Sequence, residues 1–129
     1  MTRRDEAEYL LERSKQFLET AKYQIKKGFF SLAVFSLEQA LQLSLKSKML
    51  ASGVDYPRTH GVRTLLEMLS DLASEEERVT VKQMLDSYLL ELGMLEDAYI
   101  TSRYVRREFR KEEAEVLMKA VKEVMKNVT

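Results

Sequence analysis

The sequence contains no cysteine and only one histidine. Without cysteine the chain has no disulfide, no thiolate nucleophile and no cysteine-ligated zinc. A single histidine also excludes a metal site built from several imidazoles of one chain. We therefore expect no metal cofactor. The lack of cysteine is typical of intracellular proteins, so we expect a cytoplasmic location.

The sequence also lacks an excess of charge of either sign. Its 129 residues include 21 basic and 21 acidic ones, for a formal net charge of zero at pH 7. A neutral chain has no overall attraction for nucleic acid or an anionic membrane, so such binding would need a local patch. The longest uncharged run, Gly28 to Leu37, is too short to cross a bilayer, and the N-terminus does not resemble a signal peptide. We expect a soluble protein without membrane contact.

Glycine and proline are scarce, with four and one residues. Little is left to form the turns of hairpins, and no long segment alternates apolar and polar residues. Apolar residues instead recur at the helical steps of three and four. The length suits one domain with one core, so we expect a single domain over residues 1–129. The sequence predicts an all-α bundle of about five helices, four long and one short.

Local signals predict where these helices begin and end. The predicted helices cover about residues 7–25, 29–45, 62–72, 75–99 and 114–128. The second is so apolar that we expect it to be central. Gly53 is expected to cap its C-terminal end, and Thr59 to cap the third helix. Ser74 and Glu77 form a capping-box pattern, and Gly93 is a tolerated weak point within the fourth helix.

Three groups of polar residues are candidates for a site. The first is a basic cluster that contains Tyr104 and Phe109 and consists of Arg103, Arg106, Arg107, Arg110 and Lys111. It is either a solvated corner of the surface whose charge is neutralised by the acidic residues Glu112, Glu113 and Glu115, or a contact for an anion or RNA. No glycines are spaced as in a phosphate-binding loop, so any nucleotide would be held by side chains.

The second group is a polar stripe on the apolar second helix, made of Glu38, Gln39, Gln42 and Lys46. Their spacing places them on one helix face. That face is either the solvent edge of the helix, which is the ordinary expectation, or the floor of a polar groove.

The third candidate is His60, which lies between Arg58 and Arg63 at the expected start of the short helix. A helix start favours an anion, so the three residues suit a phosphate or carboxylate. A lone histidine there is more often a capping or packing residue. Acting as a general base would require a positioned partner that the sequence does not identify.

An ordered set of segments resembles the HEPN domain, a helical family named for suspected nucleotide binding. The segments are Leu37-Glu38-Gln39-Ala40, Lys46, Gly53-Val54, 57–66 (PRTHGVRTLL), Ser102-Arg103-Tyr104 and Glu112-Glu113-Ala114. They follow the family's order from about Glu8 to Met125. The resemblance implies an up-and-down helical bundle that commonly dimerises and often accompanies a minimal nucleotidyltransferase, as in toxin–antitoxin pairs.

The chain departs from the ribonuclease members of that family. Many of them carry an Arg followed by a His a few residues later, near the last helices. No His follows His60 here, and neither Arg58 nor Arg63 recreates the spacing. The resemblance therefore implies a non-catalytic branch that binds a nucleotide or a transferase partner. A ribonuclease with an atypical site and a plain scaffold bundle are the alternatives, and RNA binding is not favoured.

The matched positions with useful chemistry are Lys46, His60, Arg103 and Tyr104. We expect them to line one polar groove for a nucleotide such as ATP or GTP. Arg103 would bind phosphate through its fork and Lys46 as a point charge, while Tyr104 stacks on a base and His60 donates a hydrogen bond. Alternatively, Tyr104 packs and Arg103 pairs with a glutamate. Arg106, Arg107 and Arg110 form a secondary basic patch.

Broad apolar stripes also bear on association. The first, second and fourth predicted helices carry more apolar surface than one small bundle covers readily. We therefore expect a homodimer. A complex with a partner nucleotidyltransferase would use the same surface.

Overall fold

The computed structural model describes residues 2–58, 61–104 and 107–128, with only the backbone described for residues 100–104. These ranges contain six helices and no strand, which confirms the all-α class. The helices are α1 (Arg3–Lys26), α2 (Phe30–Ala51), α3 (Val62–Leu72), α4 (Glu75–Ser87), α5 (Leu89–Tyr104) and α6 (Lys111–Val128). None of the helices in the described ranges combines the length and apolar character needed to span a bilayer.

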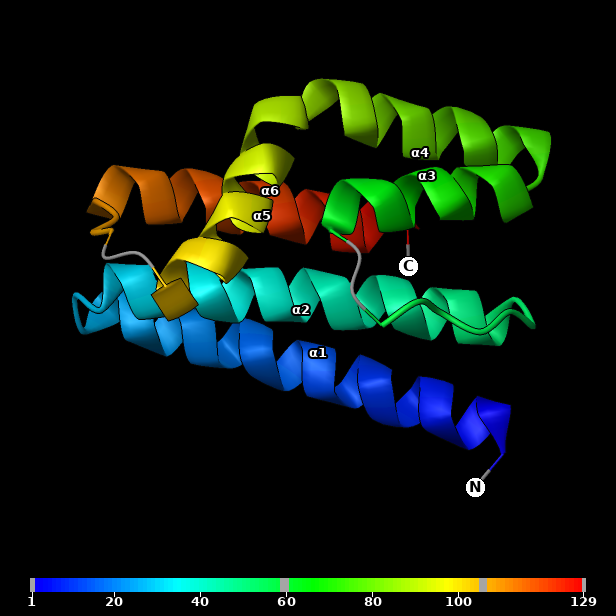
Figure 1. Cartoon of the computed structure of the whole chain (residues 1–129), viewed down its shortest axis with the longest axis horizontal. Coiled ribbons are helices and arrows are strands. Elements are labelled where there is room, and N and C mark those ends of the chain that lie inside the picture. Colours follow the sequence, from blue (N-terminus) through cyan, green and yellow to red (C-terminus); the bar gives the residue numbers. More distant parts are fainter. Residues whose placement is uncertain (1, 59–60, 105–106, 129) are drawn as a thin grey trace.

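Helix α2 is the centre of the bundle, as its composition predicts. It pairs antiparallel with α1 and also packs against α6, α3 and α5 (Figure 1). Its apolar side chains Val34, Leu37, Leu41, Leu45 and Met49 are fully buried. A helix covered on several sides must be apolar around most of its circumference. A polar side chain on a covered face of α2 is therefore expected to form its hydrogen bonds with protein groups rather than with water.

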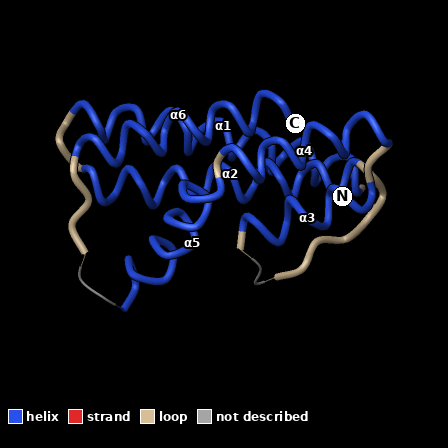
Figure 2. The backbone as a smooth tube through the Cα atoms, turned by 90° about the horizontal axis from the view of Figure 1, so that it is seen from above, coloured by secondary structure: helices blue, strands red, loops and turns tan. Residues whose placement is uncertain are grey.

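The helix expected over residues 75–99 is wrong in one respect, because the chain turns at Tyr88 (φ −119°, ψ 26°). The amide of Tyr88 still donates to the Met84 carbonyl, and its own carbonyl accepts from the Leu92 amide. The turn therefore costs few hydrogen bonds. It lets α4 pack against α3 while α5 crosses over α2 and buries Leu92 and Leu95 completely (Figures 1 and 2). Gly93 lies inside α5 rather than at the break.

The helix ends follow the sequence signals in part. Gly53, with φ +87°, ends α2 as expected. Its amide donates to the Leu50 carbonyl and the next amide to the Met49 carbonyl, which is the Schellman pattern. The N-cap of α3 is Gly61, so the expected cap at Thr59 is wrong. Thr59 itself lies outside the described residues.

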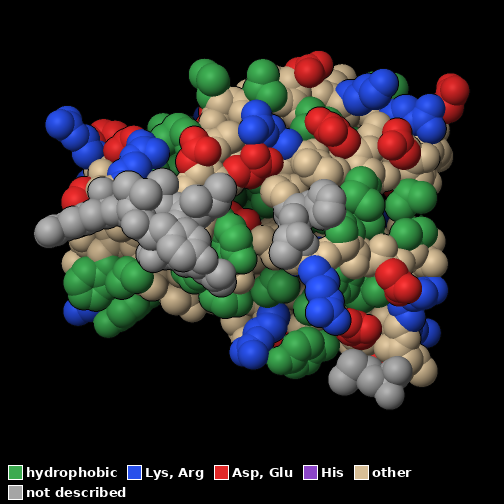
Figure 3. All heavy atoms as spheres, in the orientation of Figure 1, with side chains coloured by type: hydrophobic (Ala, Val, Ile, Leu, Met, Phe, Trp, Pro, Cys, Tyr) green, Lys and Arg blue, Asp and Glu red, His purple; other side chains and the backbone are tan. Residues whose placement is uncertain are grey.

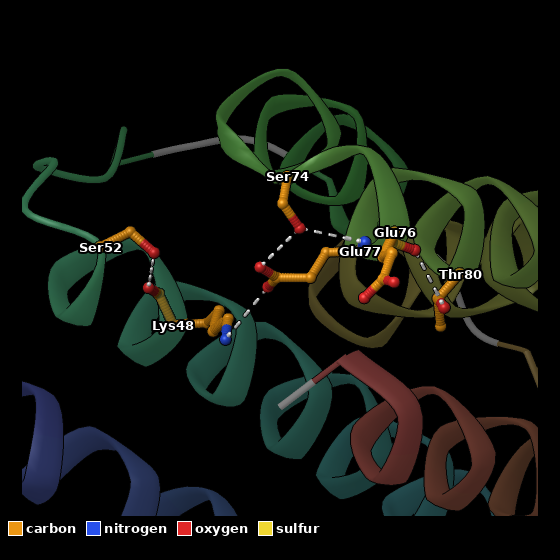
Figure 4. Close-up of polar contacts among 6 residues, drawn as sticks. All are labelled: Lys48, Ser52, Ser74, Glu76, Glu77 and Thr80. Carbon is orange, nitrogen blue, oxygen red and sulfur yellow. Dashed lines mark hydrogen bonds and ion pairs between the residues drawn. The ribbon is translucent and has the colours of Figure 1, made fainter.

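At the start of α4, Ser74 acts as the expected N-cap. Its hydroxyl accepts the Glu77 amide at 3.3 Å and lies 3.1 Å from the Glu77 carboxylate (Figure 4). The carboxylate thus meets the hydroxyl of Ser74, whereas the expected box pairs it with the amide. The same carboxylate lies 3.7 Å from the Lys48 ammonium of α2. The cap therefore also connects α4 to the central helix.

Candidate functional site

The polar stripe on α2 is buried, and the ordinary expectation of a solvent edge is wrong. Glu38 is 1% exposed and Lys46 7%, and the two glutamines are half-buried. The Glu38 carboxylate accepts the Gln39 amide at 2.8 Å and the Gln42 amide at 2.9 Å. The Gln42 side-chain oxygen in turn accepts the Lys46 ammonium at 2.8 Å. A chain of hydrogen bonds thus joins two opposite charges across two turns of helix.

Burial dominates the electrostatics of both charged groups. It raises the pKa of Glu38 above its ordinary value of 4.5, although Gln42, Gln39 and Lys46 oppose the shift. It also lowers the pKa of Lys46 from 10.5, and the Glu38 charge opposes that shift. Desolvation disfavours the charged form of each group. The charge of each group thus favours the charged form of the other, and the two glutamines also favour the charged form of Glu38.

Tyr56, in the loop after α2, covers the Lys46 end of the stripe. The ammonium nitrogen lies 5.1 Å from the centre of the Tyr56 ring, within the range of a cation–π contact. The Tyr56 hydroxyl donates to the Glu6 carboxylate of α1 at 3.2 Å. Burial, followed by the Glu6 charge, raises the pKa of Tyr56. This loop thus connects α1 to the stripe.

Glu96 of α5 caps the N-terminal end of α3. One carboxylate oxygen accepts the Arg63 backbone amide at 2.9 Å. The other accepts both Arg63 Nη2 at 2.9 Å and Nε at 3.2 Å, so two guanidinium N–H groups donate to one oxygen. Glu96 raises the pKa of Arg63, first through these hydrogen bonds and then through its charge. Because the N-cap Gly61 has no side chain, Glu96 supplies from another helix the acceptor that an N-cap normally provides.

The glycine at position 61 makes this approach possible. A Cβ atom there would lie 2.5 Å from Glu96 Oε1, much closer than real Cβ contacts. The backbone of Gly61 (φ −67°, ψ 162°) is one that any residue adopts, so the constraint is steric rather than conformational. Gly61 directly follows His60, so the contact fixes the chain immediately after that candidate residue.

The stripe and the Glu96 contact belong to one region of the bundle. The Glu96 charge is one of the causes that raise the pKa of Glu38, so the two carboxylates interact through space. We call Glu38, Gln42, Lys46, Arg63 and Glu96 the polar network. It lies where α5 crosses α2 and where the chain returns from the end of α2 to the start of α3 (Figure 1).

The predicted groove is described only in part. Lys46 belongs to the polar network. His60 lies outside the described residues, as do the side chains of Arg103 and Tyr104. Their backbone forms the last turn of α5. Position 103 follows Glu96 by two helical turns, which places it on the same face of α5. Convergence of the four residues therefore stays a prediction.

In the secondary basic patch, Arg107 is paired with an acidic side chain. Its guanidinium lies 3.1 Å from the Glu113 carboxylate and 4.2 Å from the centre of the Phe109 ring. Glu113 also accepts the Arg110 backbone amide at 2.9 Å. The acidic first turn of α6 thus neutralises Arg107, as the solvated-corner interpretation expects. Arg110 and Lys111 are exposed, and Arg106 lies outside the described residues.

The described surface on this side of the molecule carries charges of both signs. Lysine and arginine side chains alternate with aspartate and glutamate on the face shown in Figure 3. Among the described residues, no group of three or more histidine, aspartate and glutamate side chains is placed to hold a metal ion. The chemistry available in the polar network is therefore that of a guanidinium, an ammonium, amides and two carboxylates.

Sequence reasoning missed Arg63–Glu96 as a pair and missed Tyr56. Arg63 and Glu96 are 33 residues apart and lie on different helices, so no spacing rule connects them. Tyr56 stands next to the only proline, in a segment that reads as a loop without function. One local feature does point to a partner for the start of α3. Because its N-cap is a glycine, the first amides of α3 have no acceptor on the N-cap side chain, so an acceptor must come from elsewhere.

Comparison with known proteins identifies a family. The family model described as the HEPN domain matches residues 7–129. A comparison with curated proteins finds no relative that matches the chain. The matched range contains the whole polar network.

The contact between Gly61 and Glu96 predicts a specific energetic coupling. We expect Gly61→Ala to lower the free energy of unfolding by about 1–2 kcal/mol, because the new Cβ displaces the carboxylate. Glu96→Ala should cost about 1–3 kcal/mol. In the Glu96→Ala background, Gly61→Ala should cost less, about 0.5–1 kcal/mol, because only the loss of the better N-cap residue remains. Urea denaturation of the four proteins measures this cycle.

Gly93→Ala is a matched control within α5. The nearest atom to a Cβ at position 93, Arg63 Nη1, lies at an ordinary 3.7 Å. This substitution should therefore stabilise the protein by about 0.5–1 kcal/mol through helix propensity. Additive costs of Gly61→Ala and Glu96→Ala would contradict the proposed contact.

Proposed function

The chain belongs to the HEPN domain family, and from that premise we propose that it is a nucleotide-binding module whose ligand is held at the polar network. The family suggests either nucleotide binding or ribonuclease-like activity. ATP and GTP are the nucleotides proposed here. The Arg63 guanidinium and the predicted groove residues would supply the contacts to phosphate and base.

The observation that carries this proposal is the burial of Glu38 and Lys46 in the middle of the central helix. Taking two charges out of water costs several kcal/mol per ion, and well-packed apolar side chains often do as well for stability. A bundle that serves only as a scaffold could place apolar side chains at these positions and avoid this desolvation cost. Ionisable groups whose pKa is shifted by burial beside a charged partner are found at functional sites.

The network leaves donors for an anionic ligand. Lys46 is 7% exposed and donates to Gln42, so in our proposal it acts on an anionic ligand through its charge rather than through direct contact. The Arg63 side chain is 42% exposed, so its guanidinium is accessible on one side while Glu96 holds the other. In our proposal Arg103 binds phosphate bidentately, Tyr104 stacks on the base and His60 donates a hydrogen bond that strengthens on protonation.

Ribonuclease activity is the alternative outcome of the test. Acid–base catalysis needs a group near the substrate whose pKa suits proton transfer. Glu38 has a raised pKa but is 1% exposed, so it does not reach an RNA backbone in this conformation. The only histidine of the chain is His60. The described side chains thus favour binding over cleavage.

Calorimetric titration with ATP and GTP tests the proposal. We expect weak binding that falls as salt rises. Arg103→Ala should weaken it about tenfold or more, because a bidentate phosphate contact is lost. Arg13→Ala is the matched control, since Arg13 is exposed on α1 and should leave the affinity unchanged.

Two results would count against this function. Absence of binding by the wild-type protein would exclude ATP and GTP as ligands. Equal binding by Arg103→Ala at unchanged stability would exclude Arg103 from the site. Cleavage of mixed RNA that Arg103→Ala abolishes would replace the proposal with the ribonuclease alternative.

We also propose that the protein acts as a homodimer, with a minimal nucleotidyltransferase as a possible toxin–antitoxin-like partner. Exposed apolar side chains support association: Phe29 and Leu32 at the start of α2 are 51% and 58% exposed, and Leu90 of α5 is 79% exposed. These side chains would be buried if they met a second copy of the chain.

Light scattering coupled to size exclusion measures the oligomeric state. At tens of micromolar, we expect the mass of a dimer rather than the 15.1 kDa of one chain. Leu90→Glu or Leu32→Glu should shift the protein toward monomer if the substituted residue lies in the interface. A monodisperse wild-type monomer would exclude the homodimer.

A further inference from the structure

A groove runs between the second half of α1 and the outer side of α6. The two helices are antiparallel and lie along the same long side of the bundle (Figures 1 and 2). The groove has a volume of about 790 Å³. We call it the lysine groove; the residues that define it are Tyr23, Ile25, Lys26, Met118, Lys119 and Lys122. It shares no lining residue with the polar network.

The floor of the lysine groove is apolar. Ile25 is half-buried and Met118 is 9% exposed, so their outer atoms form the surface that a ligand would meet. Tyr23 stands higher on the wall and is 59% exposed. The Lys27 ammonium lies 5.7 Å from the centre of its ring, over one face. Exposed tyrosine beside an apolar floor is typical of protein interfaces.

The walls carry more positive than negative charge. Five lysines and three glutamates line the groove. Lys22 is paired with Glu19 at 3.1 Å. Within the described part of the chain, Lys26, Lys119 and Lys122 make no ion pair. Both walls therefore offer ammonium groups to an acidic partner.

We propose that the lysine groove docks an acidic amphipathic helix of a partner protein. From Lys111 to Glu123 the α6 wall extends about 18 Å, enough for about three turns of a docked helix. The apolar stripe of that helix contacts Ile25 and Met118, and its flanking carboxylates meet the lysines. This is helix-in-groove recognition with charge complementarity at the edges.

Nucleic acid fits the same surface less well. Glu115 and Glu123 lie in the wall with the lysines, and a nucleic-acid backbone, which is charged at every nucleotide, would meet them, whereas a helix can place its carboxylates opposite the lysines only. The apolar floor also has nothing to offer a phosphate, whereas leucine side chains bury against it favourably. The groove therefore selects a ligand that is both apolar and acidic.

Fluorescence anisotropy with a synthetic peptide tests this inference. The probe is a fluorescein-labelled four-turn helix with leucines at i, i+3, i+4 and i+7 and glutamates on both flanks. We expect saturable binding that Tyr23→Ala weakens about tenfold, as for the loss of an interface anchor. The double variant Lys119→Glu, Lys122→Glu should weaken it about tenfold or more, most strongly at low salt.

Matched controls lie outside the groove. Tyr9→Ala removes a tyrosine of similar exposure, 52%, from the other end of α1. Lys82→Glu reverses an exposed lysine on α4. Both should leave the peptide affinity within about twofold of the wild-type value. Because all substituted residues are surface residues, circular dichroism should show an unchanged helical fold for each variant.

Three results would overturn the inference. The first is the absence of saturable peptide binding up to about 0.5 mM protein. The second is a loss of peptide affinity in the control variants that equals the loss in the groove variants. The third is that a single-stranded RNA probe binds more tightly than the peptide and that the lysine substitutions abolish this RNA binding. Nucleotide titration of the same groove variants separates the two proposals, since ATP or GTP binding at the polar network should be unaffected by Tyr23→Ala.

Discussion

The burial of a carboxylate and an ammonium on the central helix constrains much of the rest of this structure. Glu38 and Lys46 lie on a helix that is covered by α1, α3, α5 and α6, so neither charge has ready access to water. Their separation of two helical turns is bridged by Gln42. An ion pair that is buried without such hydrogen bonds would be strongly destabilising. The two glutamines and the Tyr56 ring therefore stabilise the buried charges at this place.

The same requirement explains features of the neighbouring elements. Glu96 adds a second carboxylate near Glu38, and its charge is balanced by Arg63 through two guanidinium N–H groups and a backbone amide. That arrangement needs α5 to cross α2 at an angle, which the turn at Tyr88 permits, and needs an N-cap of α3 without a side chain, which Gly61 provides. Contacts from three helices thus converge on one region. The proposed nucleotide site adds His60, which directly precedes Gly61 in the sequence, and Arg103, which is seven residues after Glu96.

Sequence patterns predicted the helical class, the central place of α2 and several helix ends because these depend on local periodicity and capping. Ser74 and Gly53 are examples of signals that act within a few residues. The turn at Tyr88 was not predicted because the four-three rhythm of apolar residues continues through it. Periodicity placed Glu38, Gln42 and Lys46 on one face but did not identify what covers that face. The Arg63–Glu96 contact spans 33 residues and could come only from the packing of α3 against α5.

The pH dependence of stability tests most directly whether burial disfavours the charge of Glu38. Burial raises its pKa above 4.5, so the folded protein binds this proton more tightly than the unfolded chain does. Raising the pH from 4.5 toward neutrality should therefore reduce the free energy of unfolding of the wild-type protein relative to Glu38→Gln, which keeps the shape of the side chain without its charge. Urea denaturation of both proteins across this range should show a difference that grows in favour of Glu38→Gln as the pH rises. A difference that is independent of pH, or that grows in favour of the wild-type protein, would contradict the buried carboxylate.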